Sequence, residues 1–363
     1  MGVTTSDAAF NGSRARIRTV NLGVNSLTPS PMVPPGPLPS FLELALALIR
    51  FATGSAVSNT VDIGTNVAYR LTGGGRITVF ITQSLGFASA EWWPLQDQLS
   101  GHARVLTWNR PGYGESGPPV SPRTVSNIAA EGLQLLSRVA PDGPIVLVGH
   151  SQGGLYANAM ARLVAGRVIA VVLLDPAHPN NSRLRQELSP KLLRGSGSDL
   201  SVRLRMARTL ARLRVIGLLK PFMLRQPPFL YCAHHSPNAL HAMWRHLRRA
   251  QAYEVALAEY EELEHRTSPA TLEALGPFPP APVTVLVHDP EVMIEFFMRY
   301  GHLDRVDAER VEGLWGALLR DHVNLSPLAQ VEEVAGSGHL IHLEQPELTL
   351  FRIVKAVDSR TGR

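Results

Sequence analysis

The chain has 363 residues, 45% of them hydrophobic, and a formal net charge of +5. This length suits one α/β domain with an inserted segment, and no run approaches the ~20 apolar residues of a transmembrane helix. The single cysteine, Cys232, excludes an internal disulfide, and the sequence shows no metal-ligand motif, phosphate loop or dinucleotide motif. We therefore expect no metal and no cofactor, and a cytoplasmic protein by default.

The first 40 residues are rich in Pro, Ser, Gly and Asn, which is typical of a disordered or extended arm. The apolar run from Phe41 to Ile49 is interrupted by Glu43. It predicts a short helix that packs on the body, with a membrane-surface contact as the alternative. We assign residues 1–55 to this N-terminal arm.

Strand and helix patterns alternate along much of the remaining chain. Strands are expected at 61–63, 67–71, 77–81, 105–108, 145–148, 168–174, 282–287 and 331–334. Helices are expected at 124–139, 155–164 and 308–320. Because most of these strands are apolar on both faces, they predict a doubly wound, mostly parallel α/β sheet with helices on both sides.

Strand patterns stop between 182 and 279, where helical and basic sequence takes over. One face of a predicted helix carries the apolar residues Val202, Met206, Leu210 and Leu213, with arginines opposite. We expect a helical cap over 182–279, inserted into a core made of 56–181 and 280–363.

The basic charge gathers in this cap. Eleven Arg or Lys and only two acids lie between Arg183 and Arg225. Such a surface suits an acidic carrier protein or an anionic substrate, although a solvated arginine face gives the same composition. Most basic residues of the whole chain are arginine, as a GC-rich genome would produce, so we infer no nucleic-acid binding from charge.

One short stretch joins a buried strand to a helix through Gly149-His150-Ser151-Gln152-Gly153. A serine in such a sharp turn is strained, so the residues two positions to either side must lack clashing side chains. The turn also places Ser151 at a helix N-terminus, where free N–H groups favour negative charge. This context indicates a nucleophile elbow, with a plain glycine-rich turn as the alternative.

Together with this elbow, the order of strands, helices and loops resembles that of the α/β-hydrolase superfamily over about residues 60–357. The resemblance also rests on the loop 82–89, the run Asn109-Arg110-Pro111-Gly112-Tyr113-Gly114-Glu115-Ser116 and the segment Gly336-Ser337-Gly338-His339. The strand end 173–179 is similar to a bacterial branch that reads Val-Asp-Ala-Ser-His-Pro there. Epoxide hydrolases and haloalkane dehalogenases carry aspartate at the elbow, so a serine implies acyl transfer through an acyl-enzyme.

The resemblance implies a Ser-His-Asp triad with Ser151 as nucleophile and His339 as base. His342 nearby is expected to serve packing. Two carboxylates compete for the role of the acid: Asp289, in the usual place after the penultimate strand, and Asp175, one strand earlier. Each precedes a proline and could be a simple turn residue; we favour Asp175.

An oxyanion hole needs two backbone N–H groups, and the resemblance assigns these to Leu85 and Gln152. The usual His-Gly pair at the head of the first loop is Gln83–Ser84 in this chain. Backbone donors do not need those side chains. A glycine, however, lets the loop approach the substrate closely, so Ser84 in its place bears on catalytic efficiency.

We therefore expect a serine esterase or thioesterase that binds a small-molecule acyl substrate under the cap. An acyltransferase or a cyclising thioesterase is one alternative, since an alcohol or amine can replace water. A non-catalytic binding protein on the same fold is another. The scaffold hosts many reactions, so the sequence does not name the substrate.

Overall fold

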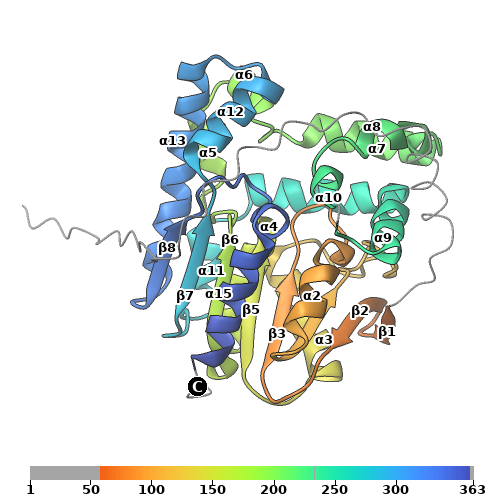
Figure 1. Ribbon diagram of the computed structural model, residues 1–363, viewed down its shortest axis with the longest axis vertical. Helices are drawn as coiled ribbons and strands as arrows, with labels where there is room; N and C mark the ends of the chain where they lie inside the picture. Colours follow the sequence, from red (N-terminus) through yellow and green to blue (C-terminus); the bar gives the residue numbers. More distant parts are fainter. Residues whose placement is uncertain (1–57, 233, 360–363) are drawn as a thin grey trace, which may run out of the picture.

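The computed structural model describes residues 58–232 and 234–359, so the predicted N-terminal arm and its apolar run lie outside the described residues. The described chain is built around one eight-stranded sheet, with strand order β1-β2-β4-β3-β5-β6-β7-β8 (Figure 1). The strands are β1 (Asn59–Asp62), β2 (Asn66–Thr72), β3 (Thr78–Thr82), β4 (Arg104–Trp108), β5 (Ile145–His150), β6 (Val168–Leu174), β7 (Val283–Val287) and β8 (Ala329–Glu333). Each predicted strand is present, shifted by at most a few residues.

The pairing confirms the mostly parallel sheet. β1 pairs antiparallel with β2, and β2 antiparallel with β4. From β4 to β8 every neighbouring pair is parallel. The carboxyl ends of β5, β6, β7 and β8 therefore meet at one edge, which is where ligands bind in open α/β sheets.

The helices before β6 are α2 (Trp93–Leu99), α3 (Val125–Val139) and α4 (Gln152–Leu163). Between β6 and β7 lie α5 (Ser182–Glu187), α6 (Pro190–Gly195), α7 (Ser201–Arg212), α8 (Lys220–Met223), α9 (Pro237–Leu247), α10 (Ala250–His265) and α11 (Pro269–Glu273). The rest are α12 (Pro290–Gly301), α13 (Arg305–Asp321), α14 (Ile341–Glu344) and α15 (Pro346–Asp358). The helices predicted in the core correspond to α3, α4 and α13, and the helix predicted around Val202–Leu213 corresponds to α7, whereas α2, α12 and α15 were not among the predicted elements.

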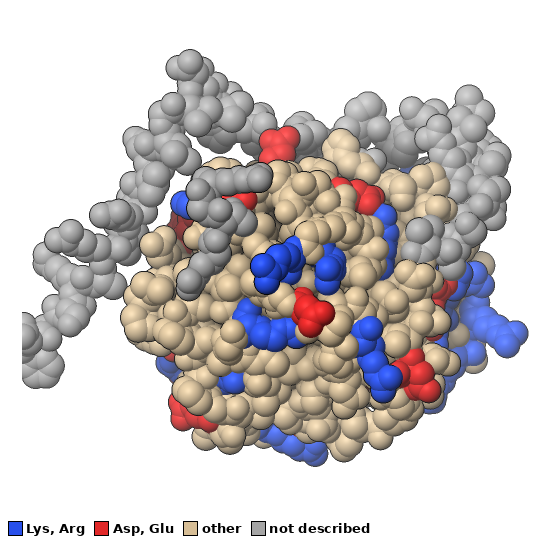
Figure 2. All heavy atoms as spheres, turned by 90° about the horizontal axis from the view of Figure 1, so that it is seen from below, with Lys and Arg blue, Asp and Glu red and all other residues tan. Residues whose placement is uncertain are grey.

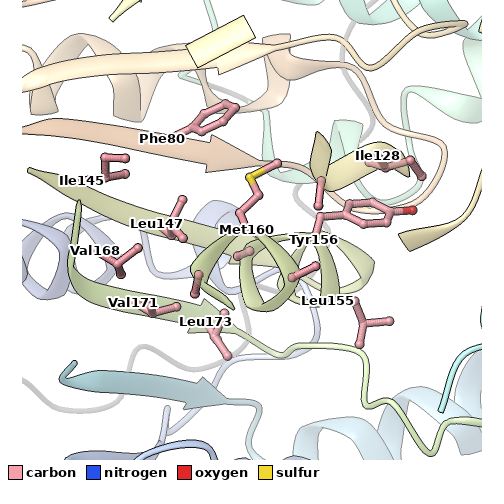
Figure 3. Close-up of a cluster of buried hydrophobic side chains, with 14 of the residues drawn as sticks. Phe80, Ile128, Ile145, Leu147, Leu155, Tyr156, Met160, Val168, Val171 and Leu173 are labelled. Carbon is pink, nitrogen blue, oxygen red and sulfur yellow. The ribbon is translucent and has the colours of Figure 1, made fainter. Parts of the chain in front are cut away.

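Alternate residues of the central strands point to opposite faces of the sheet and build two cores. On one face, Leu147 of β5 and Val171 of β6 pack with α3 and with Tyr156 and Met160 of α4 (Figure 3). On the other face, residues such as Val146 pack against α2 and α15. The parallel strands are thus buried on both sides, as their apolar sequence predicted.

The helices between β6 and β7 cover the carboxyl edge of the sheet (Figure 1). α7 packs on α10 through Leu204, Ala207 and Ala211. Most of the apolar face predicted from the α7 sequence is instead turned to solvent, because Val202 and Met206 are 54% and 61% exposed. Only Leu210 of that face is partly buried, against the cluster that contains Tyr253. The periodicity was right, but it marks the outer side of the helix.

α12 extends the same cover, although it lies outside 182–279. Met293 and Phe297 of α12 share a buried cluster with Leu193 of α6 and with α13. The backbones of Gly195 and Gly301 touch so closely that a Cβ on Gly301 would lie 1.9 Å from the Gly195 carbonyl oxygen. Among the described residues, none of these helices combines the length and apolarity needed to cross a bilayer.

Candidate active site

Ser151 occupies the turn between β5 and α4. Its backbone has a conformation that residues other than glycine rarely adopt. Its φ is +52°, and its backbone N–H donates to the Leu174 carbonyl at 3.0 Å. A Cβ on Gly149 would lie 2.5 Å from the Gly153 carbonyl oxygen, and one on Gly153 would lie 2.2 Å from that of Thr82. The two glycines are therefore required by close backbone contact, which holds the strained serine in place.

His339 lies in the loop that follows β8, next to Ser151. The loop is pinned by Glu344, whose carboxylate accepts from the N–H of Gly338 at 2.7 Å and of Leu340 at 3.1 Å. The His339 carbonyl accepts a hydrogen bond from His150 Nε2 at 2.9 Å. Glu344 thus fixes the backbone on both sides of His339, a role that the sequence analysis did not assign.

The His339 imidazole is paired with Asp175. Its Nδ1 lies 2.6 Å from Asp175 Oδ2. An ionised carboxylate can only accept, so Nδ1 carries the proton and Nε2 is left as the basic nitrogen. No described hydrogen bond joins His339 to Ser151 Oγ; in free enzymes this contact is commonly long and tightens with substrate.

The environment keeps Asp175 ionised although it is fully buried. Burial by itself raises the pKa of this carboxyl, but the adjacent His288 and the hydrogen bonds from His288 and His339 hold the pKa below its usual value. A charged acceptor is therefore present beside His339 throughout the neutral range.

Asp289 stands elsewhere. Its carboxylate accepts from the N–H of Glu291 at the start of α12 and from the N–H of Gly336 at 2.9 Å. It caps α12 and holds the loop at Gly336, and no described hydrogen bond joins it to His339. His342, the other nearby histidine, is buried and stacks on Trp92 at a centroid distance of 4.2 Å.

The two expected oxyanion donors line the same cavity as Ser151. Gln152 opens α4, where the first N–H groups have no partner within the helix. Leu85 lies in the loop after β3, and no described hydrogen bond uses its N–H. The Gln83 side chain, which replaces the usual histidine, donates to the Trp108 carbonyl at 2.7 Å.

A buried arginine holds this loop, and it is the main feature that sequence reasoning missed. Arg110 donates to the carbonyl of Gln83 at 2.8 Å and to that of Ser84 at 3.0 Å. Its guanidinium also pairs with Glu259 of α10 at 3.0 Å, with both side chains fully buried. Glu259 accepts from Tyr113 as well, and its own carbonyl accepts from the Gln152 side chain. Glu259 also pairs with the buried Arg123 at 3.4 Å. Arg110 therefore links α10 to the loop after β3, and only the long-range fold brings these segments together.

A cavity of about 420 Å³ lies between the sheet edge and the covering helices. Ser151, Asp175 and His339 line its floor, together with Leu85 and Gln152. Its remaining wall is largely apolar and comes mainly from the segment 182–279 and from α12, with Phe87 of the loop after β3 and Trp315 of α13. Apolar residues of this wall include Phe87, Leu184, Leu200, Val292, Met293 and Phe296.

One group of side chains has the composition of a metal site. Glu91, His150 and His342 are buried, and their potential ligand atoms lie within 4.8 Å of one another. His342 Nε2 is 3.8 Å from Glu91 Oε2, wider than the roughly 3.4 Å between ligands of a tetrahedral zinc ion. Burial raises the pKa of Glu91 to about 8. These side chains would have to move inward to hold an ion, so we assign none.

Many of the basic residues that the sequence places in the cap are paired within the chain. Ion pairs join Arg183–Glu187, Arg185–Glu264, Lys191–Asp307, Arg205–Glu261 and Arg212–Glu254. Arg203, which lines the cavity, has no described ion pair. Figure 2 shows the opposite side of the molecule, away from these helices, where both basic and acidic side chains occur.

Comparison with known proteins decides the family. A profile of the Alpha/beta hydrolase family matches residues 73–350. The chain belongs to this family. The match spans strands β3 to β8, the elbow and the segments that cover it, which confirms the resemblance drawn from the sequence.

Individual relatives match only parts of the chain. Lipase LipV of Mycobacterium tuberculosis is 41% identical over 83 residues, 22% of this chain and 31% of the lipase. A putative carbamate hydrolase, RutD of Agrobacterium fabrum, is 29% identical over 131 residues, 35% of this chain and 49% of that protein. The chain thus spans less than half the length of these curated relatives. The crystal structure of an enol-lactonase from Burkholderia xenovorans LB400 superposes with a TM-score of 0.54 at 20% identity, covering 83% of this chain and all of that one. That likeness shows the shared fold.

Proposed function

We propose that the protein is a serine hydrolase that cleaves a carboxylic ester or thioester through an acyl-enzyme. The observation that carries the proposal is the 2.6 Å contact between His339 Nδ1 and Asp175 Oδ2, in a cavity that Ser151 also lines. Ser151 serves as nucleophile, His339 as general base and Asp175 as the acid that orients His339.

The reaction follows from these roles. His339 Nε2 takes the proton of Ser151 Oγ as the oxygen attacks the substrate carbonyl carbon. The negative charge that develops on the carbonyl oxygen is met by the N–H groups of Leu85 and Gln152. His339 then gives its proton to the leaving alcohol or thiol, and a water molecule repeats the two steps to release the acid.

The cavity favours a small to medium apolar substrate. Its volume of about 420 Å³ lies within the usual range for small-molecule sites, and most of its wall is apolar. The hydrophobic wall suits the apolar chain of an acyl group, and the polar floor suits its carbonyl group, which would lie at Ser151.

Steady-state kinetics test this proposal. p-Nitrophenyl esters from acetyl to octanoyl, with a matching acyl thioester, are given to wild type and to Ser151→Ala. We expect turnover by the wild type and a loss of kcat by about 10³-fold or more in the variant. Ser198→Ala, which alters another serine of the cavity wall, serves as the control. Equal activity of Ser151→Ala and wild type would refute the assignment.

A second candidate is an ester whose distal end is anionic, and Arg203 is the observation that favours it. This exposed arginine lines the cavity and has no described ion pair, so it is free to meet a carboxylate or phosphate. An acyl group carried by an acidic carrier protein, which would dock on the segment 182–279, is a second form of anionic substrate. Arg203→Gln should raise KM for a succinate monoester and leave KM for a neutral ester unchanged. Equal changes for both esters would remove this candidate.

The same acyl-enzyme can pass its acyl group to an alcohol or amine, which would make the protein an acyltransferase. Product analysis with a competing alcohol separates the two reactions. An ester product that outweighs the free acid at low alcohol concentration would favour transfer over hydrolysis.

A further inference from the structure

The Asp175 carboxylate has a second imidazole partner besides His339. The ring of His288, at the end of β7, places Nδ1 at 2.8 Å from Asp175 Oδ1 and 3.0 Å from Oδ2. The backbone N–H of His288 also donates to Oδ1 at 3.1 Å. One residue thus supplies two donors to Asp175, and it comes from the strand adjacent to β6.

α13 holds the His288 ring from its other side. His288 Nε2 faces Glu312 Oε1 at 3.8 Å, and both atoms are buried without another hydrogen-bond partner. Trp315, one turn further along α13, packs edge-on against His288 at 5.2 Å and also contacts His339 at 5.4 Å between ring centroids. Glu312 and Trp315 are three residues apart and so share one face of the helix.

Asp175 needs such support, because its backbone is in the left-handed region, with φ +42°. This conformation is unfavourable for a residue with a side chain, and it persists only where the surroundings hold it. The donors from His288 also set the plane of the carboxylate, which decides whether Oδ2 faces His339.

We propose that His288 is a positioning residue for this site: it orients the Asp175 carboxylate toward His339 and is itself held by Glu312 and Trp315. This inference rests on the proposed function, in which Asp175 orients the general base. His288 touches neither the nucleophile nor the cavity, so it acts only through Asp175.

The same contact brings the His288 ring to the carboxylate that faces His339. Burial lowers the pKa of His288, but Asp175 and Glu312 together raise it above its usual value. A protonated His288 offsets part of the charge on Asp175 and so weakens the support that this carboxylate gives to a proton on His339. The charged groups that face His288 are Asp175, Glu312 and Glu333. Those that face His339 are Asp175, Glu91 and Glu344, with His150 and His342 beside it.

Two substitutions separate the positioning of Asp175 from the charge of His288. His288→Leu removes the side-chain donor and the charge. His288→Asn keeps an N–H donor near the place of Nδ1 and removes only the charge. His178→Gln is the matched control, since His178 is also buried and pairs with a carboxylate, Asp321, at 3.0 Å without contacting Asp175.

Two readouts are used: kinetics on p-nitrophenyl butyrate as a function of pH, and the pKa of His339 from an NMR titration of its ring. We expect His288→Leu to lower kcat roughly tenfold to 100-fold with KM within about twofold. His288→Asn should recover most of kcat, raise the pKa of His339 and move the acid limb of kcat/KM to higher pH. Wild-type kcat in His288→Leu, or an unchanged pKa of His339 in His288→Asn, would overturn the proposal.

The NMR titration keeps this test separate from the proposed function. If the wild type cleaves no ester, the proposed function fails. The pKa of His339 in wild type, His288→Asn and His178→Gln still decides whether His288 acts on His339 through Asp175.

Discussion

At the scale of single residues, the site is decided by which carboxylate reaches His339. The sequence favoured Asp175 but left Asp289 open, because both follow an apolar strand and both precede a proline. The two differ only in three dimensions, where Asp175 Oδ2 lies 2.6 Å from His339 and the Asp289 carboxylate accepts from the N–H groups of Glu291 and Gly336.

A pair of isosteric substitutions tests this difference. Asp175→Asn should lower kcat by about 10⁴-fold, since an amide stabilises the wrong tautomer of the histidine. Asp289→Asn should lower kcat far less, because Asn caps a helix as well as Asp does and only the acceptor for the Gly336 N–H is lost. Parallel measurements of kcat/KM on one ester are sufficient. A larger loss in Asp289→Asn than in Asp175→Asn would exchange the two roles.

Residue identity alone could not reveal the partners of the site. Ser151 and His339 stand in recognisable motifs, so they could be named from the sequence. His288 and Glu344 stand in no motif, and their roles depend on strand ends and loops that meet only after folding.

At the scale of elements, the sequence predicted the strands well and the helices less completely. Continuous apolar runs mark the buried parallel strands, and the elbow marks the start of α4. α12 was missed because Asp289–Pro290 was interpreted as a turn, although Asp at the N-cap with Pro at the first position is also a helix start. The exposed apolar face of α7 shows that periodicity does not say which side of a helix is buried.

The pairing of α10 with the oxyanion loop gives a prediction at this scale. Glu259→Gln leaves the buried charge of Arg110 without its main partner and should lower the free energy of unfolding by about 3–5 kcal/mol. The double variant Arg110→Met/Glu259→Leu should cost less, because both charges of this pair are then removed and the neighbouring Arg123 keeps its other partner, Glu131. Urea unfolding gives both values.

An exposed pair on the same helix is the control. Glu254, paired with Arg212, is 40% exposed, so Glu254→Gln should change the free energy of unfolding by less than about 1 kcal/mol. If Glu259→Gln were equally mild, the buried pair would not be what joins the cap to the loop.

At the scale of the whole molecule, the fold class and the family could be predicted because strand order and motif order are properties of the entire chain. The arrangement of the helices that cover the carboxyl edge of the sheet could not be predicted. The cavity is lined by α12 and by loops whose arrangement depends on packing between distant segments, such as the contact of Gly195 with Gly301.

Buried histidines give the molecule a predictable dependence on pH. Burial lowers the pKa of His246 and of His322 to about 4, and it also lowers the pKa of His150 and His342. A lowered pKa in the folded state means that the unfolded chain binds the proton first. The stability from these groups is therefore complete above pH 6.5 and is lost as the pH falls toward 4.

We expect the free energy of unfolding to fall between pH 7 and pH 5, with each such histidine contributing up to about 1.4 kcal/mol per pH unit. His322→Phe should reduce this slope, while substitution of the exposed His265 by Gln should not. Urea unfolding at four pH values measures the slope. A free energy that is constant or rises toward pH 5 would contradict the assignment of neutral buried histidines.

The most direct test of the account is covalent labelling by a fluorophosphonate, followed by peptide mass spectrometry. The reagent reacts with a serine only when a base activates it, so it needs no knowledge of the substrate. The account predicts rapid labelling at Ser151, lost in Ser151→Ala and strongly slowed in His339→Ala and Asp175→Asn. A folded wild type that takes up no label, or takes it up on another residue, would contradict a serine hydrolase at this site.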